Sequence, residues 1–172
     1  PFDHLSFAGT LMLFIFGFGF AKPVPVNIRN FNYKKRKLYF GLTALAGPVS
    51  NLLLATIFSL LSAIFMSISQ TNSSEVLEIA DIFFYYVAYY NVCLAVFNLI
   101  PFPPLDGSRI LGIFLPDKLY YKMLEYERYL YYALLGLLFI FNRIGFSPIS
   151  FVSEFIFDFI YSIFSMIFGL II

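Results

Sequence analysis

The chain alternates long apolar runs with short polar connectors, and the lengths of the runs suit helices that cross a bilayer. A spanning helix needs about 20 mostly apolar residues. Four runs of this kind or nearly so occupy residues 38–69, 79–100, 130–141 and 149–172. A further run at 5–21 carries three glycines, so it either spans or re-enters the bilayer against protein. The pattern predicts an all-α polytopic membrane protein with about five hydrophobic segments.

Composition strengthens this prediction, because 60% of the 172 residues are hydrophobic and only 12% are charged. A soluble domain of this size leaves much of its surface in water and needs more charge to cover it. The single cysteine, Cys93, excludes an internal disulfide and every Cys-rich zinc pattern. We treat residues 1–172 as one transmembrane domain. Because the chain starts without Met and ends inside an apolar run, we expect it to be a fragment of a longer protein.

The charges are unevenly divided among the connectors. Residues 22–37 hold six of the eleven basic residues and no acid, whereas residues 70–81 hold three acids and no base. Residues 101–128 contribute four further basic side chains. The positive-inside rule therefore predicts that 22–37 and 101–128 are cytoplasmic and that 70–81 lies outside.

Two short segments resist description as plain lipid-facing helix. Two prolines spaced by one residue favour a short extended, β-like segment near 21–27, which is either a simple loop or an edge that receives another strand. In 46–51, near the start of a long apolar helix, Pro48 is tolerated and the small residues allow close helix approach. Small-residue packing does not explain Asn51, whose amide needs a hydrogen-bond partner in an apolar setting.

The segment 98–107 is the most informative, because three prolines break a helix near 101–104 and Asp106 follows at once. Broken backbone at membrane depth is tolerated only against protein or a polar cavity, and an ionisable group beside it suggests a functional site. Asn91 and Asn98 share a helix face, and we expect them to face the same interior as Asp106. Alternatively, Asp106 caps a helix that starts at Gly107. Both interpretations remain open at this point.

The order of three segments, 18–27, 46–51 and 98–107, resembles the site-2 protease family, zinc metalloproteases that cut within the membrane. The resemblance is to the compact prokaryotic branch without a PDZ domain, and it covers residues 1–115. It implies that Asp106 is the third zinc ligand of the full-length protein and that Asn98 helps to hold the substrate. The candidate substrate-binding residues are Asn98, Asn51, Val24 and Val26.

The family's first two zinc ligands belong to a His-Glu-x-x-His helix whose glutamate is the general base, and this sequence does not contain it. The chain has one histidine, His4, which we interpret as an interfacial residue or a donor to a ligand. The general base is therefore unassigned, and we expect truncation rather than a natural pseudo-enzyme. The fragment alone is expected to be inactive. Arg109 is interpreted as a cytoplasmic charge or as a partner of Asp106.

The expected function is thus zinc-dependent hydrolysis of peptide bonds in or near transmembrane helices. The alternatives are a non-catalytic scaffold that binds such helices and, less well supported, a transporter, which usually shows paired halves. The expected partners are a transmembrane substrate and the lipid bilayer, not nucleic acid, in a prokaryotic cell membrane crossed several times. Glu154 and Asp158 share a helix face, near an interface or a cavity, and are assigned no catalytic role.

Overall fold

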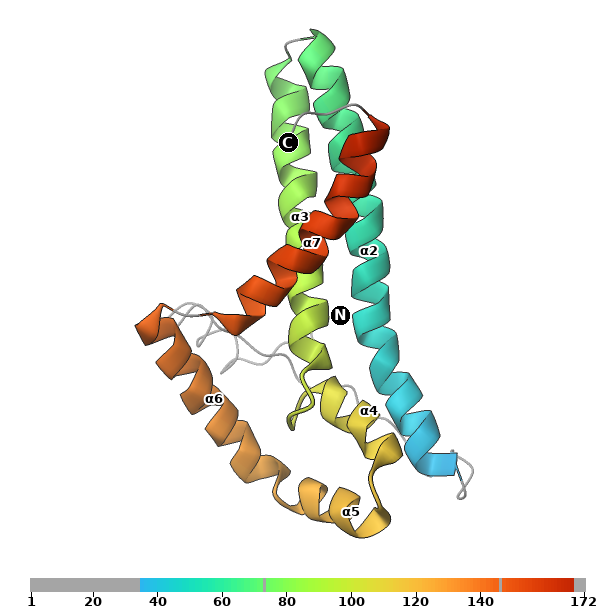
Figure 1. Ribbon diagram of the computed structural model, residues 1–172, viewed down its shortest axis with the longest axis vertical. Helices are drawn as coiled ribbons and strands as arrows, with labels where there is room; N and C mark the ends of the chain where they lie inside the picture. Colours follow the sequence, from blue (N-terminus) through green and yellow to red (C-terminus); the bar gives the residue numbers. More distant parts are fainter. Residues whose placement is uncertain (1–34, 73, 146, 169–172) are drawn as a thin grey trace, which may run out of the picture. The chain divides into compact units, whose positions relative to one another are not determined.

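The computed structural model describes residues 35–72, 74–145 and 147–168, and within these ranges every regular element is a helix. The chain divides into two units, 1–36 and 37–172, and the account below concerns the second. The helices are α2 (Arg36–Asn72), α3 (Glu75–Leu99), α4 (Asp106–Phe114), α5 (Asp117–Glu125), α6 (Glu127–Ile144) and α7 (Pro148–Ile167). Figure 1 shows their arrangement.

Three of these helices, α2, α3 and α7, are long and apolar enough to cross a membrane. They coincide with the predicted runs 38–69, 79–100 and 149–172. The fourth predicted run, 130–141, is helical but lies in α6, which has charged residues near both ends and is not among the three. Too few apolar residues remain between Arg128 and Arg143 to match the length that a span needs. The run 5–21 and the extended segment 21–27 lie outside the described residues, so five spans are not established.

The three candidate spans pack around small residues. Ala55 of α2, Ala88 and Val92 of α3 and Phe157 of α7 form one buried cluster, and α3 lies beside α7 (Figure 1). The rings of Tyr85 and Phe157 meet edge to face, with centroids 4.9 Å apart. Because lipid tails give no hydrophobic drive between helices, close packing of small side chains is what holds such a bundle together.

A polar contact joins α2 to α3 within this bundle. The buried Ser62 hydroxyl donates a hydrogen bond to Oδ1 of the half-buried Asp81, at 2.5 Å. We expect Ser62→Ala to lower the free energy of unfolding by about 1–3 kcal/mol, because Asp81 loses its partner where little water replaces it. Unfolding by SDS, followed by circular dichroism, measures this.

The matched control for Ser62 is Thr56→Ala on the same helix. The Thr56 hydroxyl is exposed and donates only to its own helix, to the carbonyl of Leu52 at 2.8 Å. Its removal should leave the SDS midpoint close to that of the wild type. Equal midpoints for Ser62→Ala and Thr56→Ala would show that the contact with Asp81 does not stabilise the bundle.

The position expected for Pro48 is wrong, because α2 begins at Arg36 and Pro48 lies inside it. Proline cannot donate to the carbonyl of Ala44 one turn earlier. Neighbouring helices allow a membrane helix to tolerate this loss, and Ala44 and Pro48 are both buried. Ser50 donates its hydroxyl to the Gly47 carbonyl at 2.7 Å, a bond that does not involve the Ala44 carbonyl.

The predicted break at the prolines is present. α3 ends at Leu99 and α4 begins at Asp106, and the intervening turn contains a cis peptide bond between Pro103 and Pro104. The turn is closed by backbone hydrogen bonds, among them one from Leu105 N to the Phe102 carbonyl at 2.9 Å. The break therefore separates α3 from α4 by a short, hydrogen-bonded turn.

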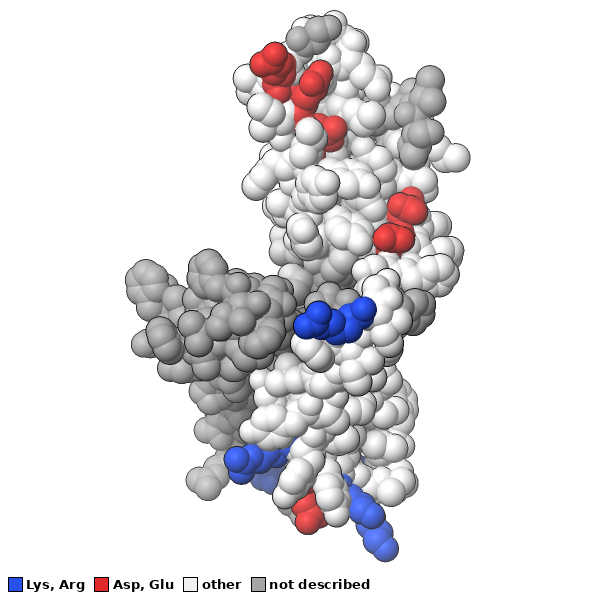
Figure 2. Space-filling model, turned by 90° about the vertical axis from the view of Figure 1, so that its left-hand side faces the viewer, with Lys and Arg blue, Asp and Glu red and all other residues white. Residues whose placement is uncertain are grey.

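Charge is unevenly distributed along the face drawn in Figure 2. Acidic side chains gather at the end where α2 is joined to α3, with a further acidic group above mid-height. Basic side chains lie at mid-height and at the opposite end, where one acidic group lies beside them. The first turn of α3 carries Glu75 and Glu78. The positive-inside rule depends on the basic side chains of such a distribution.

Candidate functional site

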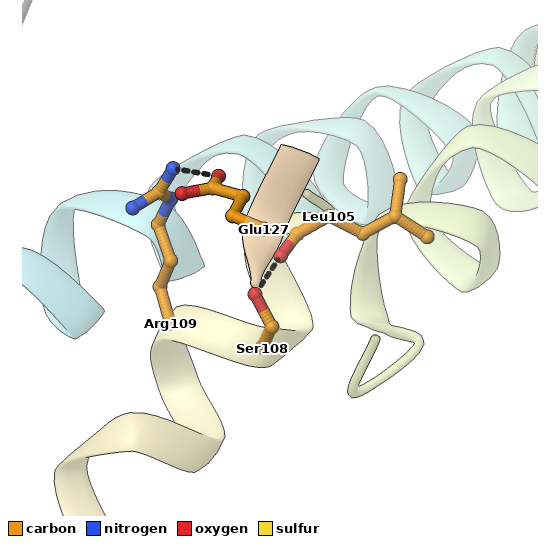
Figure 3. Close-up of polar contacts among 4 residues, drawn as sticks. All are labelled: Leu105, Ser108, Arg109 and Glu127. Atoms are coloured by element: carbon orange, nitrogen blue, oxygen red, sulfur yellow. Dashed lines mark hydrogen bonds and ion pairs between the residues drawn. The ribbon is translucent and has the colours of Figure 1, made fainter. Parts of the chain in front are cut away.

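The site is centred on Asp106, the first residue of α4, which is half-buried. The N-cap of α4 is Leu105, and no side chain forms a capping hydrogen bond there. The Ser108 hydroxyl donates instead to the Leu105 carbonyl, at 2.7 Å (Figure 3). The alternative in which Asp106 caps a helix starting at Gly107 is therefore wrong, and its carboxylate is left for another role.

The Asp106 carboxylate lies against α2 at Gly47. A Cβ atom built on Gly47 would be 3.5 Å from Oδ2 of Asp106, an ordinary van der Waals distance, so the carboxylate lies next to α2 at this residue. Two segments that the sequence singles out separately, 46–51 and 98–107, thus meet at this point. Sequence reasoning assigned Gly47 to helix packing and did not connect it with Asp106.

The start of α4 is held equally closely against the end of α3. A Cβ atom on Gly107 would overlap the carbonyl oxygens of Leu99 and Ile100, and Gly107 is buried. Only glycine permits this approach of one backbone to another. This contact fixes where Asp106, the first residue of α4, lies relative to the end of α3.

Arg109 sets the charge around Asp106. Its Nη2 lies 2.8 Å from Oε1 of Glu127 on α6 (Figure 3). Its guanidinium lies over the ring of Phe40, 4.6 Å from the centroid. Glu127, not Asp106, is therefore its ion-pair partner. Burial raises the pKa of the Asp106 carboxyl above its ordinary value, and the positive charge of Arg109 partly opposes that shift.

The predicted substrate-binding residues are only partly placed. Asn98, in the last turn of α3, and Asn51, in α2, are half-buried, and neither amide hydrogen-bonds to a residue that the structure describes. Asn91 donates to the carbonyl of Val87 in its own helix at 2.7 Å, so one of its two amide N–H donors is already used. Val24 and Val26 lie outside the described residues, as does His4.

Glu154 and Asp158 are both exposed on α7, so the interpretation in which they face an interior cavity gains no support. Nothing in the chain pattern distinguished that alternative from an interfacial position. Two residues beside the site, Phe40 and Glu127, were not identified by the sequence analysis. Both contact Arg109 from distant positions in the sequence. The charge of Arg109, whose partner the sequence did not identify, was the only indication of them.

The described residues supply one suitable metal ligand, Asp106. Within 35–72, 74–145 and 147–168, no three His, Cys, Asp or Glu side chains come together as a metal site would require. A catalytic zinc ion uses three protein ligands and an open position for water. The half-buried carboxylate of Asp106, which caps nothing and has no ion-pair partner among the described residues, suits one of those positions. The described residues do not complete the set.

Membrane-length helices around a proline break that carries a half-buried carboxylate define a helical membrane protein with a polar site. Comparison with known proteins gives the family, because residues 61–141 match the model of peptidase family M50. The match includes Asn98, Asp106, Arg109 and Glu127. The chain belongs to this family, that of the site-2 proteases.

Two curated relatives agree with this assignment. The chain is 36% identical over 129 residues to "Putative zinc metalloprotease YwhC" of Bacillus subtilis, covering 75% of this chain and 58% of that protein. It is 38% identical over 71 residues to "Putative zinc metalloprotease MJ0611" of Methanocaldococcus jannaschii, covering 41% and 32%. The chain thus spans less than two thirds of the length of either relative. No solved structure matches it.

Proposed function

We propose that this chain is part of a zinc-dependent intramembrane protease of the site-2 type, and that Asp106 is one of its zinc ligands. The observation that carries the proposal is the half-buried carboxylate at the proline break, turned toward Gly47 and not used as a helix cap. The other two ligands and the general base belong, in this proposal, to a His-Glu-x-x-His helix outside the 172 residues. The relatives' names support zinc as the metal.

Each proposed residue has a chemical task. A bound zinc ion would polarise the scissile carbonyl and lower the pKa of a water molecule. Asp106 contributes a negative oxygen ligand from a fixed helix start. The amide of Asn98 both donates and accepts hydrogen bonds, so it is suited to an extended substrate backbone. Asn51 is a second amide for the same purpose, and segment 21–27, through Val24 and Val26, is the proposed strand-pairing edge.

The proposed setting is a prokaryotic cell membrane that the chain crosses several times. Connectors 22–37 and 101–128 are placed in the cytoplasm, and the turn between α2 and α3 outside. The four basic side chains of 101–128, against none in 70–81, support this orientation. The substrate is then a protein or peptide with a transmembrane helix, reached from within the bilayer.

The full-length protein, purified in detergent, tests the proposal directly. We expect about one zinc ion per chain, as a single catalytic site requires. The gene sequence upstream should encode a His-Glu-x-x-His motif within an apolar segment. A metal-free protein, or an upstream segment without that motif, would remove the protease assignment.

The second candidate function is a non-catalytic scaffold that binds transmembrane segments. It would use the same membrane-length helices and the same proline break, without a complete metal site. Co-reconstitution with a single-span substrate distinguishes the two functions. A scaffold retains the intact substrate and holds no zinc, whereas a protease releases two fragments.

Asn98 gives a prediction specific to substrate handling. We expect Asn98→Ala in the full-length protein to slow cleavage about 3- to 10-fold, the effect of losing about one hydrogen bond. The zinc content should not change, because Asn98 is not a proposed ligand. Cleavage rates in liposomes and metal analysis of the same preparation measure both quantities. The control is Asn72→Ala at the exposed end of α2. A loss of zinc in Asn98→Ala would contradict the assigned role.

A further inference from the structure

The helix that carries Asp106 is too short to hold its own position. α4 has nine residues, and isolated helices shorter than about 12–15 residues are marginal in water. Its orientation must therefore be imposed by contacts with other elements. Any such contact also decides where the Asp106 carboxylate points.

One face of α4 rests on the backbone of α2. Asp106, Arg109 and Ile113 follow one another at helical spacing and so share that face. A Cβ atom on Gly41 would lie 2.5 Å from Cδ1 of Ile113 and 3.1 Å from the carbonyl oxygen of Arg109. Together with the contact at Gly47, this places α4 on two glycines of α2. Gly41 permits the close approach, but neither glycine offers a directional bond that would keep it.

Arg109 supplies directional contacts on that same face. Its guanidinium pairs with Glu127 of α6 (Figure 3). It also lies over the ring of Phe40, the residue before Gly41. A planar guanidinium can lie over a ring while its N–H groups pair with a carboxylate in a fixed geometry, whereas an ammonium group has no such plane. The side chains of the pair are 23% and 30% exposed, so water screens this ion pair less than Lys37–Asp117, in which Asp117 is 79% exposed.

We propose that Arg109 is a positioning residue, which clamps α4 between Phe40 of α2 and Glu127 of α6 and so holds Asp106 against Gly47. The inference rests on the proposed function for its catalytic meaning. Its structural content, a fixed distance between α4 and α2, does not depend on zinc. If Arg109 served only as a cytoplasmic charge, its replacement would not change the distance between α4 and α2.

The structural part is tested by a spin-label distance in the full-length protein. Labels are placed on Leu53→Cys in α2 and Leu111→Cys in α4, both exposed side chains, after Cys93→Ala removes the natural thiol. We expect a single narrow distance distribution with Arg109, and a broadened or shifted one in Arg109→Gln. Arg109→Lys keeps the charge without the stacking plane and should recover the distribution in part.

A matched control removes a charge of the same kind nearby. Arg128 is exposed on α6, one residue from Glu127, so Arg128→Gln should leave the distribution unchanged. If Arg109→Gln does not insert or fold, Glu127→Gln breaks the same pair without touching α4. A wild-type distribution in Arg109→Gln or, where that variant fails to fold, in Glu127→Gln would overturn the proposal, as would equal broadening in Arg128→Gln.

The catalytic part is tested by zinc affinity, measured by chelator competition on folded protein. Residues that orient a metal ligand typically change affinity about 10–100-fold when replaced. We expect a loss of that size in Arg109→Gln, partial recovery in Arg109→Lys and no change in Arg128→Gln. Unchanged affinity in Arg109→Gln despite a broadened distance would refute the effect on Asp106. A wild-type protein that binds no zinc, with the distance still dependent on Arg109, would refute the proposed function and leave the clamp standing.

Discussion

Replacing Asp106 by Ala or Asn in the full-length protein is expected to abolish zinc retention and proteolysis together. A catalytic zinc site with three protein ligands cannot lose one and keep its geometry. The loss should exceed the about 10–100-fold effect of changes beside a ligand. Metal analysis after dialysis, and cleavage of a single-span substrate in liposomes, measure the two consequences.

The same substitution should hardly affect folding, which separates it from a structural defect. Asp106 makes no capping bond, so its removal costs the interaction with the α4 dipole, about 0.3–1 kcal/mol, and the attraction to the nearby charge of Arg109. Asp117→Asn is the matched control, because Asp117 opens α5 as Asp106 opens α4, but is exposed. It should keep zinc and activity. Full zinc occupancy in Asp106→Asn would contradict the assignment of this carboxylate.

The parts of the fold that depend on local pattern were predictable. An apolar run of sufficient length produces a helix that can span wherever it occurs, and α2, α3 and α7 coincide with such runs. Prolines end a helix through their own geometry, so the break after Leu99 was visible in the sequence as well. These are statements about neighbours in the chain, which a sequence displays directly.

The prediction that failed is one that neighbouring residues along the chain do not determine. Pro48 was placed near a helix start because proline is disfavoured inside helices, but packing around the buried face of α2 allows the helix to begin at Arg36. The surroundings of the helix decided that outcome. The run 130–141 is helical within α6, but a fourth span is not confirmed and stays a prediction.

The site shows the same division. The sequence offered Asp106 as a lone carboxylate beside broken backbone, and its half-buried position agrees with that prediction. The Gly47 contact and the pair of Arg109 with Glu127 join residues of different helices. No spacing rule connects such residues, because the turn at the prolines and the packing of α4 bring them together. The capping alternative likewise needed coordinates to be rejected.

Among substitutions that add a single methyl group near the site, Gly107→Ala is expected to be the most damaging. The new Cβ would overlap the carbonyl oxygens of Leu99 and Ile100, which are backbone atoms with no rotamer to change. Overpacking of this kind costs about 3 kcal/mol or more where nothing can move aside. We expect α4 to shift away from the end of α3 and carry Asp106 with it, so that stability and zinc affinity fall together. SDS unfolding and chelator competition measure the two effects.

Gly136→Ala provides the control for Gly107→Ala, because it adds the same methyl group to a helix with nothing within 4 Å of the new atom. Removing glycine from the interior of α6 should raise stability slightly, by about 0.5–1 kcal/mol. The opposite signs of the two changes distinguish a steric contact from a general effect of alanine. If Gly107→Ala unfolds at the same SDS concentration as the wild type, the close approach of α4 to α3 is not the feature that fixes Asp106. The orientation of the carboxylate would then depend on the contacts of α4 with α2 and α6 alone.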